Sequence, residues 1–287
     1  MTYALEVNGL RKTYGDFALR DISFQVPCGS VVGLIGENGA GKSTTINAIL
    51  GLIKKESGRV VLFGKEEDAF TPADRERIGV ILDGSNFSEE LSPKRLNKVL
   101  KDIYKSWDED LFFSLTETMN LPQTKKIKTF SKGMKMKLSM AAAFSHHPRL
   151  LLLDEVTSGL DPVMRDGLLD MFLDFVQDEE HAVLLSSHIT TDLEKIADYI
   201  VFIHEGTVVF AKAKDELLES YGMIQCGAEQ LAELDRADVI ACRKMDYGWQ
   251  ALTCDRKAAE KKYPNAMVTP VTINEIMLLY VKGAQKK

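Results

Sequence analysis

Residues 36–43 read Gly36-Glu37-Asn38-Gly39-Ala40-Gly41-Lys42-Ser43, the pattern GxxxxGK[ST] of a phosphate-binding loop. An apolar run at residues 31–35, typical of a strand buried on both faces, precedes the loop, and a helical stretch at residues 44–50 follows it. The glycines let backbone N–H groups turn inward around phosphate oxygens at a helix N-terminus. Because a chance glycine-rich turn would lack this strand and helix, the stretch predicts a nucleoside triphosphatase.

Further apolar runs each lead into a polar turn and then a helical pattern, which predicts an α/β core with a parallel sheet. Ligands of such sheets gather beyond the carboxyl ends of the strands, so the functional residues should follow these runs. Short alternating segments elsewhere predict antiparallel strands beside this core. The apolar runs are residues 78–82, 150–153 and 182–185, and the alternating segments are residues 3–7, 18–26 and 59–63.

The domain organisation follows from where the pattern changes along the chain. Residues 88–147 are helical in pattern, with no strand-like alternation, and predict a helical subdomain inserted into an α/β domain of residues 1–220. Residues 221–287 mix short strands with helices and predict a small accessory α+β region. The expected helices are residues 93–104, 108–119, 132–145, 228–234 and 274–281, and the expected strands of the accessory region are residues 239–242 and 250–253.

Two adjacent acids end the apolar run at residues 150–153. An acid at the end of a buried strand is costly to desolvate unless it faces a cation or a polar cleft. Asp154 is therefore expected to orient hydrated Mg²⁺ with the Ser43 hydroxyl, while Lys42 carries a positive charge to the β- and γ-phosphates. Glu155 is the expected residue that positions and polarises the attacking water. Alone, such a string is most often a strand reaching a surface turn, but it follows a phosphate-binding loop here.

A second candidate anion-binding helix terminus lies at residues 130–134, which read Phe130-Ser131-Lys132-Gly133-Met134. This segment resembles the signature of the ABC (ATP-binding cassette) ATPases, usually written LSGGQ, in a variant typical of bacterial drug, antibiotic and peptide exporters. The resemblance extends over about residues 14–210 and rests on five motifs in order. It implies a P-loop ABC cassette with a mostly parallel core sheet, an antiparallel β subdomain, an inserted helical subdomain and a small C-terminal α+β extension.

The resemblance also implies ATP as the nucleotide and assigns roles to matching positions. Tyr14 resembles the aromatic residue that stacks on adenine, the alternative being a tyrosine at a strand edge. Asp161 matches the D-loop and can also cap the helix that begins at Pro162. His188 resembles the switch histidine that contacts the γ-phosphate, and it joins Glu155 and Lys42 as a catalytic candidate. The implied ATP contacts are Tyr14, Gly36, Glu37, Asn38, Gly39, Ala40, Gly41, Lys42, Ser43, Thr44, Ser131, Gly133 and Asp161.

Two positions depart from the family pattern. Asp83 stands where the Q-loop glutamine is expected, and its shorter, charged side chain would reach Mg²⁺ or the lytic water through a further water. It joins Ser43 and Asp154 as a candidate metal ligand. Lys132 and Met134 replace the glycine and glutamine of the signature, and we hypothesise that Lys132 adds positive potential near the γ-phosphate. The other lysines of residues 125–137 are expected on a solvated face.

One phosphate-binding loop and one signature in a chain imply, from the family, a head-to-tail dimer in which ATP is the ligand of both subunits. The second ATP-binding subunit can be identical or related. No run approaches the ~18–20 apolar residues of a membrane helix, so integral membrane permease subunits are expected to be separate chains. We expect the chain in the cytoplasm, peripheral at the inner face of the cell membrane, with its four cysteines as free thiols.

Other functional classes fit the sequence less well. A net charge of −6 disfavours nucleic-acid binding. The alternative is a non-transport ABC ATPase acting as a regulatory or ribosome- or DNA-associated module, but the chain has neither a second cassette nor a long coiled coil. A GTPase would carry an NKxD-like motif, and a small-molecule kinase has no use for the signature. A module that binds ATP without hydrolysing it would not need Glu155 and His188.

Overall fold

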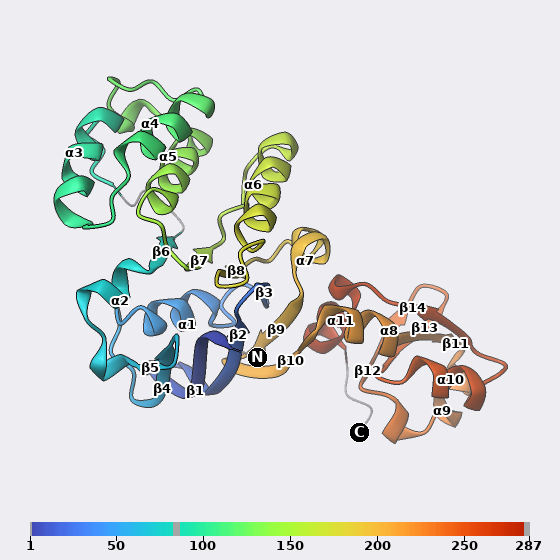
Figure 1. Cartoon of the computed structure of the whole chain (residues 1–287). Helices are drawn as coiled ribbons and strands as arrows, with labels where there is room; N and C mark the ends of the chain where they lie inside the picture. The colour runs from blue at the N-terminus through green and yellow to red at the C-terminus, as the bar shows by residue number, and fades with distance from the viewer. Residues whose placement is uncertain (1, 83–86, 284–287) are drawn as a thin grey trace.

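The structure, a computed structural model, describes residues 2–82 and 87–283. Its centre is a sheet in the strand order β10-β9-β3-β8-β7-β6, in which every neighbouring pair is parallel except β10 with β9 (Figure 1). The predicted α/β core with a mostly parallel sheet is confirmed. The strands are β3 (Ser30–Ile35), β6 (Ile78–Ile81), β7 (Leu150–Asp154), β8 (Ala182–Ser186), β9 (Tyr199–His204) and β10 (Thr207–Ala213).

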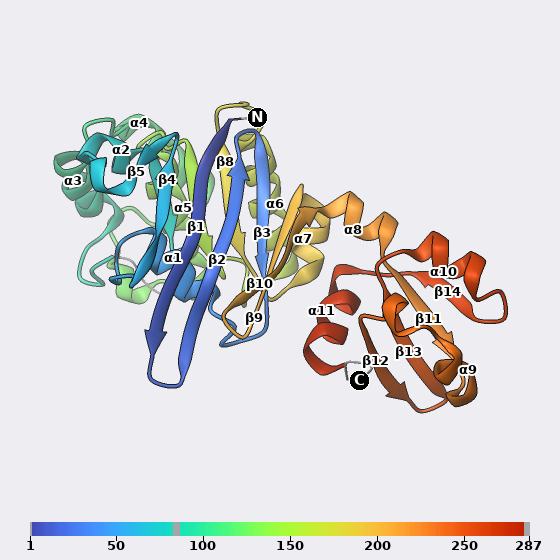
Figure 2. The same cartoon turned by 90° about the horizontal axis from the view of Figure 1, so that it is seen from below.

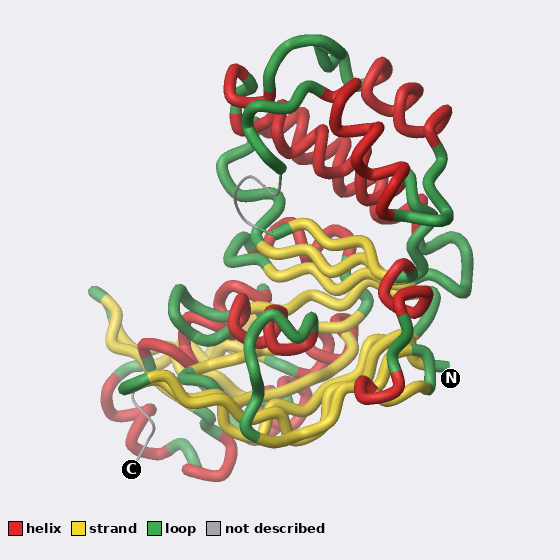
Figure 3. The backbone as a smooth tube through the Cα atoms, turned by 90° about the vertical axis from the view of Figure 1, so that its left-hand side faces the viewer, coloured by secondary structure: helices red, strands yellow, loops and turns green. Residues whose placement is uncertain are grey.

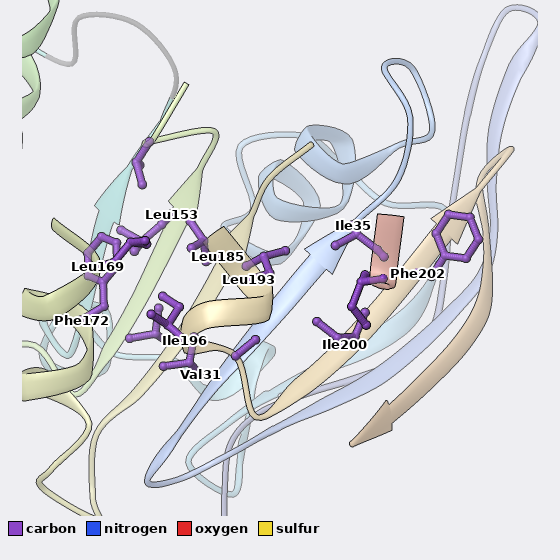
Figure 4. Packing of buried hydrophobic residues seen from close by; sticks show 14 of the residues in the cluster. Val31, Ile35, Leu153, Leu169, Phe172, Leu185, Leu193, Ile196, Ile200 and Phe202 are labelled. Atoms are coloured by element: carbon purple, nitrogen blue, oxygen red, sulfur yellow. The ribbon is translucent and has the colours of Figure 1, made fainter. Parts of the chain in front are cut away.

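Burial explains why these apolar runs become central strands. Every residue of β3, β7 and β8 is buried, as expected for a sheet covered on both faces. On one face of the sheet, buried strand residues such as Leu185 of β8 pack against α6 and α7 (Figure 4). Phe172 of α6 belongs to the same buried cluster. The sequence prediction missed β9, whose apolar run pairs in parallel with β3. The helices of the core are α1 (Lys42–Ile49), α2 (Pro72–Glu76), α6 (Pro162–Phe175) and α7 (Thr190–Ile196).

An antiparallel sheet in the order β2-β1-β4-β5 packs against the other face of the core. The alternating segments predicted as strands are all found in it, and β1 and β2 form a long hairpin (Figure 2). Apolar side chains of this hairpin share one buried cluster with α1 and the core strands. The strands are β1 (Tyr3–Tyr14), β2 (Phe17–Pro27), β4 (Ser57–Leu62) and β5 (Lys65–Glu66).

A group of helices lies above the core strands, as predicted for the inserted subdomain (Figure 3). Helix α5 joins the subdomain to the core because its two faces are both buried: Met136 and Met140 belong to the core cluster, whereas Leu138 and Ala141 belong to a cluster inside the subdomain. The helices are α3 (Pro93–Ile103), α4 (Glu109–Thr118) and α5 (Lys132–Phe144), and short 3₁₀ turns lie at Glu67–Ala69, Ile127–Thr129 and Arg236–Asp238.

The C-terminal region forms an antiparallel sheet in the order β12-β13-β11-β14, on the opposite side of the core from the helical subdomain (Figure 2). Part of its interior is separate, around Ile224 and Ala251, while Ile273 and Ile276 join the main core cluster. The two expected helices and the strand at residues 250–253 are present, whereas the strand expected at residues 239–242 begins only at Ala241 and runs to Met245. The elements α8, β11, α10 and β14 are additional. The elements are α8 (Lys214–Ser220), β11 (Gly222–Cys226), α9 (Ala228–Glu233), β12 (Ala241–Met245), β13 (Gly248–Thr253), α10 (Arg256–Lys262), β14 (Met267–Pro270) and α11 (Ile273–Lys282).

Candidate functional site

The loop of residues 36–41 connects β3 to α1, and glycine is required at both of its ends by close packing. A Cβ atom on Gly36 would come within 2.3 Å of the Ile203 carbonyl oxygen of β9. Gly41 has a φ of 112°, and a Cβ atom there would lie 2.6 Å from Leu19 Cδ2 and 2.9 Å from Phe17 Cζ. Only glycine fits both positions without displacing neighbours, so β9 and the β1–β2 hairpin fix the path of the loop.

The Lys42 ammonium group lies inside this loop. Its Nζ donates hydrogen bonds to the carbonyl oxygens of Gly36, at 2.8 Å, and Glu37, at 3.3 Å. The same atom is 3.5 Å from Glu155 Oε1, and the lysine is only 6% exposed. These contacts hold the ammonium group at a fixed point of the loop.

Asp154 and Glu155 occupy the carboxyl end of β7, beside the end of β8. The Ser186 hydroxyl donates to Asp154 Oδ1, and the Glu155 backbone N–H donates to the Ser186 carbonyl oxygen at 3.1 Å. Glu155 has a φ of 52°, a left-handed conformation in which the chain turns sharply after the strand. Its Oε2 lies 2.5 Å from His188 Nδ1, so one carboxylate contacts both the lysine and the histidine.

These groups share an open pocket of about 520 Å³. This volume is in the range of small-molecule sites, and the pocket lies beyond the carboxyl ends of the parallel strands, where the sheet topology places ligands. The pocket is lined by Phe17, Asn38, Gly39, Gly41, Lys42, Ser43, Thr44, Glu155, Ser158 and His188.

Seven predicted ATP contacts do not line this pocket: Gly36, Glu37 and Ala40 belong to the phosphate-binding loop itself, and Tyr14, Ser131, Gly133 and Asp161 come from other parts of the chain. Tyr14 ends β1 with 46% of its surface exposed, and Lys12 Nζ lies 4.9 Å from its ring centre. Ser131 caps α5 by accepting from the Met134 N–H, and Asp161 caps α6 by accepting from the Met164 N–H. Gly133 also packs near the start of α6. Asp83, a predicted metal ligand, lies outside the described residues.

Phe17 is a pocket residue that the sequence reasoning missed. It stands directly opposite Tyr14 in the β1–β2 hairpin, and its ring lies over the loop at Gly41. A signal existed in the sequence, because the short turn between the two aromatic residues places both rings near one end of the hairpin.

His204 is a second residue that the sequence did not single out. Its Nδ1 is 2.7 Å from Glu37 Oε1, and the turn after it is also fixed, since the Gly206 N–H donates to the Ala40 carbonyl oxygen at 3.0 Å. The end of β9 and the turn after it therefore hold the phosphate-binding loop at Glu37 and Ala40. His146, in contrast, is a core residue: its ring stacks on Tyr104 at 4.3 Å and burial lowers its pKa.

The lysines near the signature have acidic neighbours. Lys126 and Lys128 both pair with Glu90, at 2.6 and 2.8 Å, and Lys135 pairs with Glu89 at 2.5 Å. These contacts account for part of the basic cluster as an ion-paired surface. Lys132 instead lies over the turn that precedes α6: its Nζ is 3.3 Å from the position of a Cβ atom on Gly159.

Comparison with known proteins agrees with this geometry. The ABC transporter family profile matches residues 19–158. The lantibiotic transport ATP-binding protein SrtF of Streptococcus pyogenes is 34% identical over 233 residues, which are 80% of this chain and 95% of that protein. The bacitracin transport ATP-binding protein BcrA of Bacillus licheniformis is 33% identical over 214 residues, 73% of this chain and 69% of the relative.

Solved structures show the same relationship. The ATP-binding subunit of an ABC transporter superimposes with a TM-score of 0.67 and 29% identity, covering 75% of this chain and 91% of that one. The cassette MJ1267 in its ADP conformation, at 22% identity, has a TM-score of 0.64 and covers 75% and 93% of the two chains, which supports the fold. None of the helices in residues 2–82 and 87–283 could span a lipid bilayer. The chain belongs to the ABC transporter family, as an ATP-binding subunit that hydrolyses ATP to power transport.

Proposed function

We propose that ATP binds in the pocket beside Lys42 and that Glu155 positions the water that attacks the γ-phosphate. The observation that carries this proposal is the convergence of three groups from separate elements. Lys42 opens α1, Glu155 follows β7 and His188 follows β8, yet the Glu155 carboxylate is 3.5 Å from Lys42 Nζ and 2.5 Å from His188 Nδ1. A lysine, a carboxylate and a histidine that meet beside a phosphate-binding loop are suited to phosphoryl transfer to water.

The roles of the three side chains follow from their contacts. Lys42 Nζ attracts the phosphates because its contacts with two backbone carbonyl oxygens and with Glu155 hold it at a fixed point of the loop. Glu155 accepts a hydrogen bond from the lytic water and orients it, and its contact with His188 holds the carboxylate in place. The other nitrogen of His188 is left to contact the γ-phosphate.

The oxygen atoms of Ser43 and Asp154 fit a Mg²⁺ ion bound with ATP. Hydroxyl and carboxylate oxygens are its preferred protein ligands, with phosphate oxygens and waters completing the set. The Ser43 side chain lines the pocket, and the buried Asp154 carboxylate at the end of β7 receives a hydrogen bond from Ser186. When bound, the ion would neutralise charge on the phosphate oxygens. A role for Asp83 in this ligand set remains a prediction from the sequence.

We further propose that this pocket is one half of a composite site. Ser131 and Asp161 cap the starts of α5 and α6, and neither they nor Gly133 line the pocket of their own chain. A second subunit in head-to-tail orientation would bring its Ser131 and Gly133 to the phosphates. The partner is the same chain or a related one, and Lys132 would add positive potential beside the γ-phosphate.

The transport direction is also a proposal. The relatives named for lantibiotic and bacitracin transport, together with the Ser131–Met134 variant of the signature, support export of a peptide-like compound. Separate integral membrane permease subunits would receive the chain at the inner face of the cell membrane. Closing and opening of the ATP-bound dimer would then drive their conformational change.

The composite site predicts that ATP hydrolysis depends on the concentration of the chain. Phosphate release per subunit should rise with protein concentration while the subunits are mostly monomeric, and then level off when dimers dominate. A rate per subunit that is constant from nanomolar to micromolar protein, with monomers shown by light scattering, would refute the composite site.

The adenine contact can be assigned by removing one ring at a time. Tyr14→Ala should raise the Kd for ATP about tenfold, because loss of a base–aromatic stack costs ~1–3 kcal/mol, and should leave the Kd for inorganic triphosphate unchanged. Tyr14→Phe keeps the ring and should bind ATP as the unmodified chain does. If Phe17→Ala weakens ATP binding and Tyr14→Ala does not, the stacking residue is Phe17.

A further inference from the structure

Helix α11 of the C-terminal region lies against α7 of the ATP-binding domain (Figure 1). The Glu194 carboxylate of α7 accepts a hydrogen bond from the Ile273 backbone N–H at 2.7 Å. Ile273 is the first residue of α11, so its N–H has no acceptor within that helix. A carboxylate at a helix N-terminus is also favoured by the helix dipole. The two helices are therefore joined by a directional, charge-assisted contact.

Apolar packing makes this contact rigid. Leu193 and Ile196 of α7, which Figure 4 shows, belong to one buried cluster with Ile273 and Ile276 of α11. All four residues are at most 3% exposed. The methyl groups of Leu193 also lie directly on the β3 backbone, since a Cβ atom on Gly33 would be 2.9 Å from Leu193 Cδ1. Closely packed interiors transmit displacements, so we expect a shift of α11 to displace α7 on the sheet.

The amino end of α7 leads directly to the nucleotide pocket. The helix begins at Thr190, two residues after His188, and the connecting turn is closed by the Ile189 N–H, which donates to Ser187 Oγ at 2.9 Å. Ser187 is itself held to β3, because its N–H donates to the Leu34 carbonyl oxygen at 3.2 Å. His188 is thus placed by a short turn between β8 and α7.

The carboxyl-terminal end of α11 contacts β9, the strand that supports the phosphate-binding loop. The Tyr280 ring packs edge-on against Phe202 of β9, with ring centres 5.7 Å apart, and against Phe210 of β10, at 6.0 Å. Strand β9 ends at His204, which contacts Glu37 of the phosphate-binding loop. Helix α11 therefore contacts α7, which begins two residues after His188, and β9, which ends at His204.

We infer that the C-terminal region positions His188 through α7 and that Glu194 is the positioning residue of this link. The inference rests on the proposed role of His188. It assigns the C-terminal region a regulatory function: a ligand or partner that displaces α11 would change the rate of hydrolysis without entering the nucleotide pocket. Coupling of this kind typically amounts to roughly 5- to 150-fold between two sites.

The test compares Glu194 variants of the full chain with ATP and Mg²⁺. Glu194→Ala should lower kcat roughly 5- to 10-fold and leave KM for ATP unchanged, because the phosphate-binding loop is not altered. Glu194→Gln retains an oxygen acceptor for the Ile273 N–H and should restore most of kcat. Glu233→Ala removes the same charge from an exposed position on α9 and should change neither constant.

A double-mutant cycle separates positioning from stability. If Glu194 acts through His188, Glu194→Ala should lower the residual rate of the His188→Ala chain by much less than it lowers the rate of the unmodified chain. An equal loss in both backgrounds, or a lower Tm with unchanged kcat, would overturn the inference. If Glu194→Ala does not fold, Glu194→Asp, with its shorter carboxylate, enters the same cycle. An unchanged kcat in His188→Ala alone would instead reject the proposed role of His188.

Discussion

Glu155→Gln is expected to lower kcat for ATP hydrolysis by about 10²- to 10⁴-fold, the range of a lost general base. The substitution keeps the size of the side chain but removes the basic carboxylate that lies between Lys42 and His188. Binding of ATP should survive, since Lys42 and the loop backbone remain. The ATP-bound dimer should therefore accumulate, and gel filtration with ATP and Mg²⁺ should show it as a species twice the mass of the chain.

The matched control is Glu180→Gln, the same chemical change at a side chain that is 70% exposed and pairs with Arg149 on the surface. This variant should hydrolyse ATP at the unmodified rate and form no trapped dimer. Phosphate release near the unmodified rate in Glu155→Gln would mean that another group activates the water, and the assignment of Glu155 would be wrong.

Lys42→Ala should act one step earlier, on the binding of ATP. Truncating one partner of a buried, hydrogen-bonded charge pair costs at least ~2 kcal/mol, so the Kd for ATP should rise about 30-fold or more. Part of this loss arises because the Glu155 carboxylate, 3.5 Å from Nζ, would be left facing the phosphates without a cation. Titration with a fluorescent ATP analogue measures the effect.

Lys98→Ala, at an exposed position on α3, serves as the control for loss of a lysine and should bind ATP normally. Thermal unfolding without nucleotide should confirm that both variants are folded. A Kd unchanged by Lys42→Ala would place the phosphates elsewhere than the loop of residues 36–41.

The sequence predicted those features whose place in the fold is determined by a pattern of neighbouring residues. Residues 36–43 carry their own glycine pattern and helix start, and Glu155 follows an apolar run whose burial determines its place in the sheet. Strand β9 was missed although its run Ile200–Ile203 is just as apolar. Without it, the contact between His204 and Glu37 could not be foreseen.

Other features have no local pattern at all. Glu194 and Ile273 are 79 residues apart and meet because α7 and α11 share one buried cluster. Strand β14 is a short edge strand with partly exposed residues, so neither alternation nor an apolar run marks it. The placement of Phe17 rather than Tyr14 in the pocket depends on the path of a hairpin end, which spacing alone does not determine.

The central claim is that each chain supplies half of an ATP site, and mixing two inactive variants tests it most directly. Lys42→Ala has a defective phosphate-binding loop and an intact signature, whereas Ser131→Arg has an intact loop and a signature blocked by a bulky side chain. In a mixed head-to-tail dimer, one of the composite sites would contain both intact halves. We predict that each variant alone releases almost no phosphate and that the mixture regains a clear fraction of the unmodified rate. A mixture no more active than its components, with both variants folded, would contradict the account.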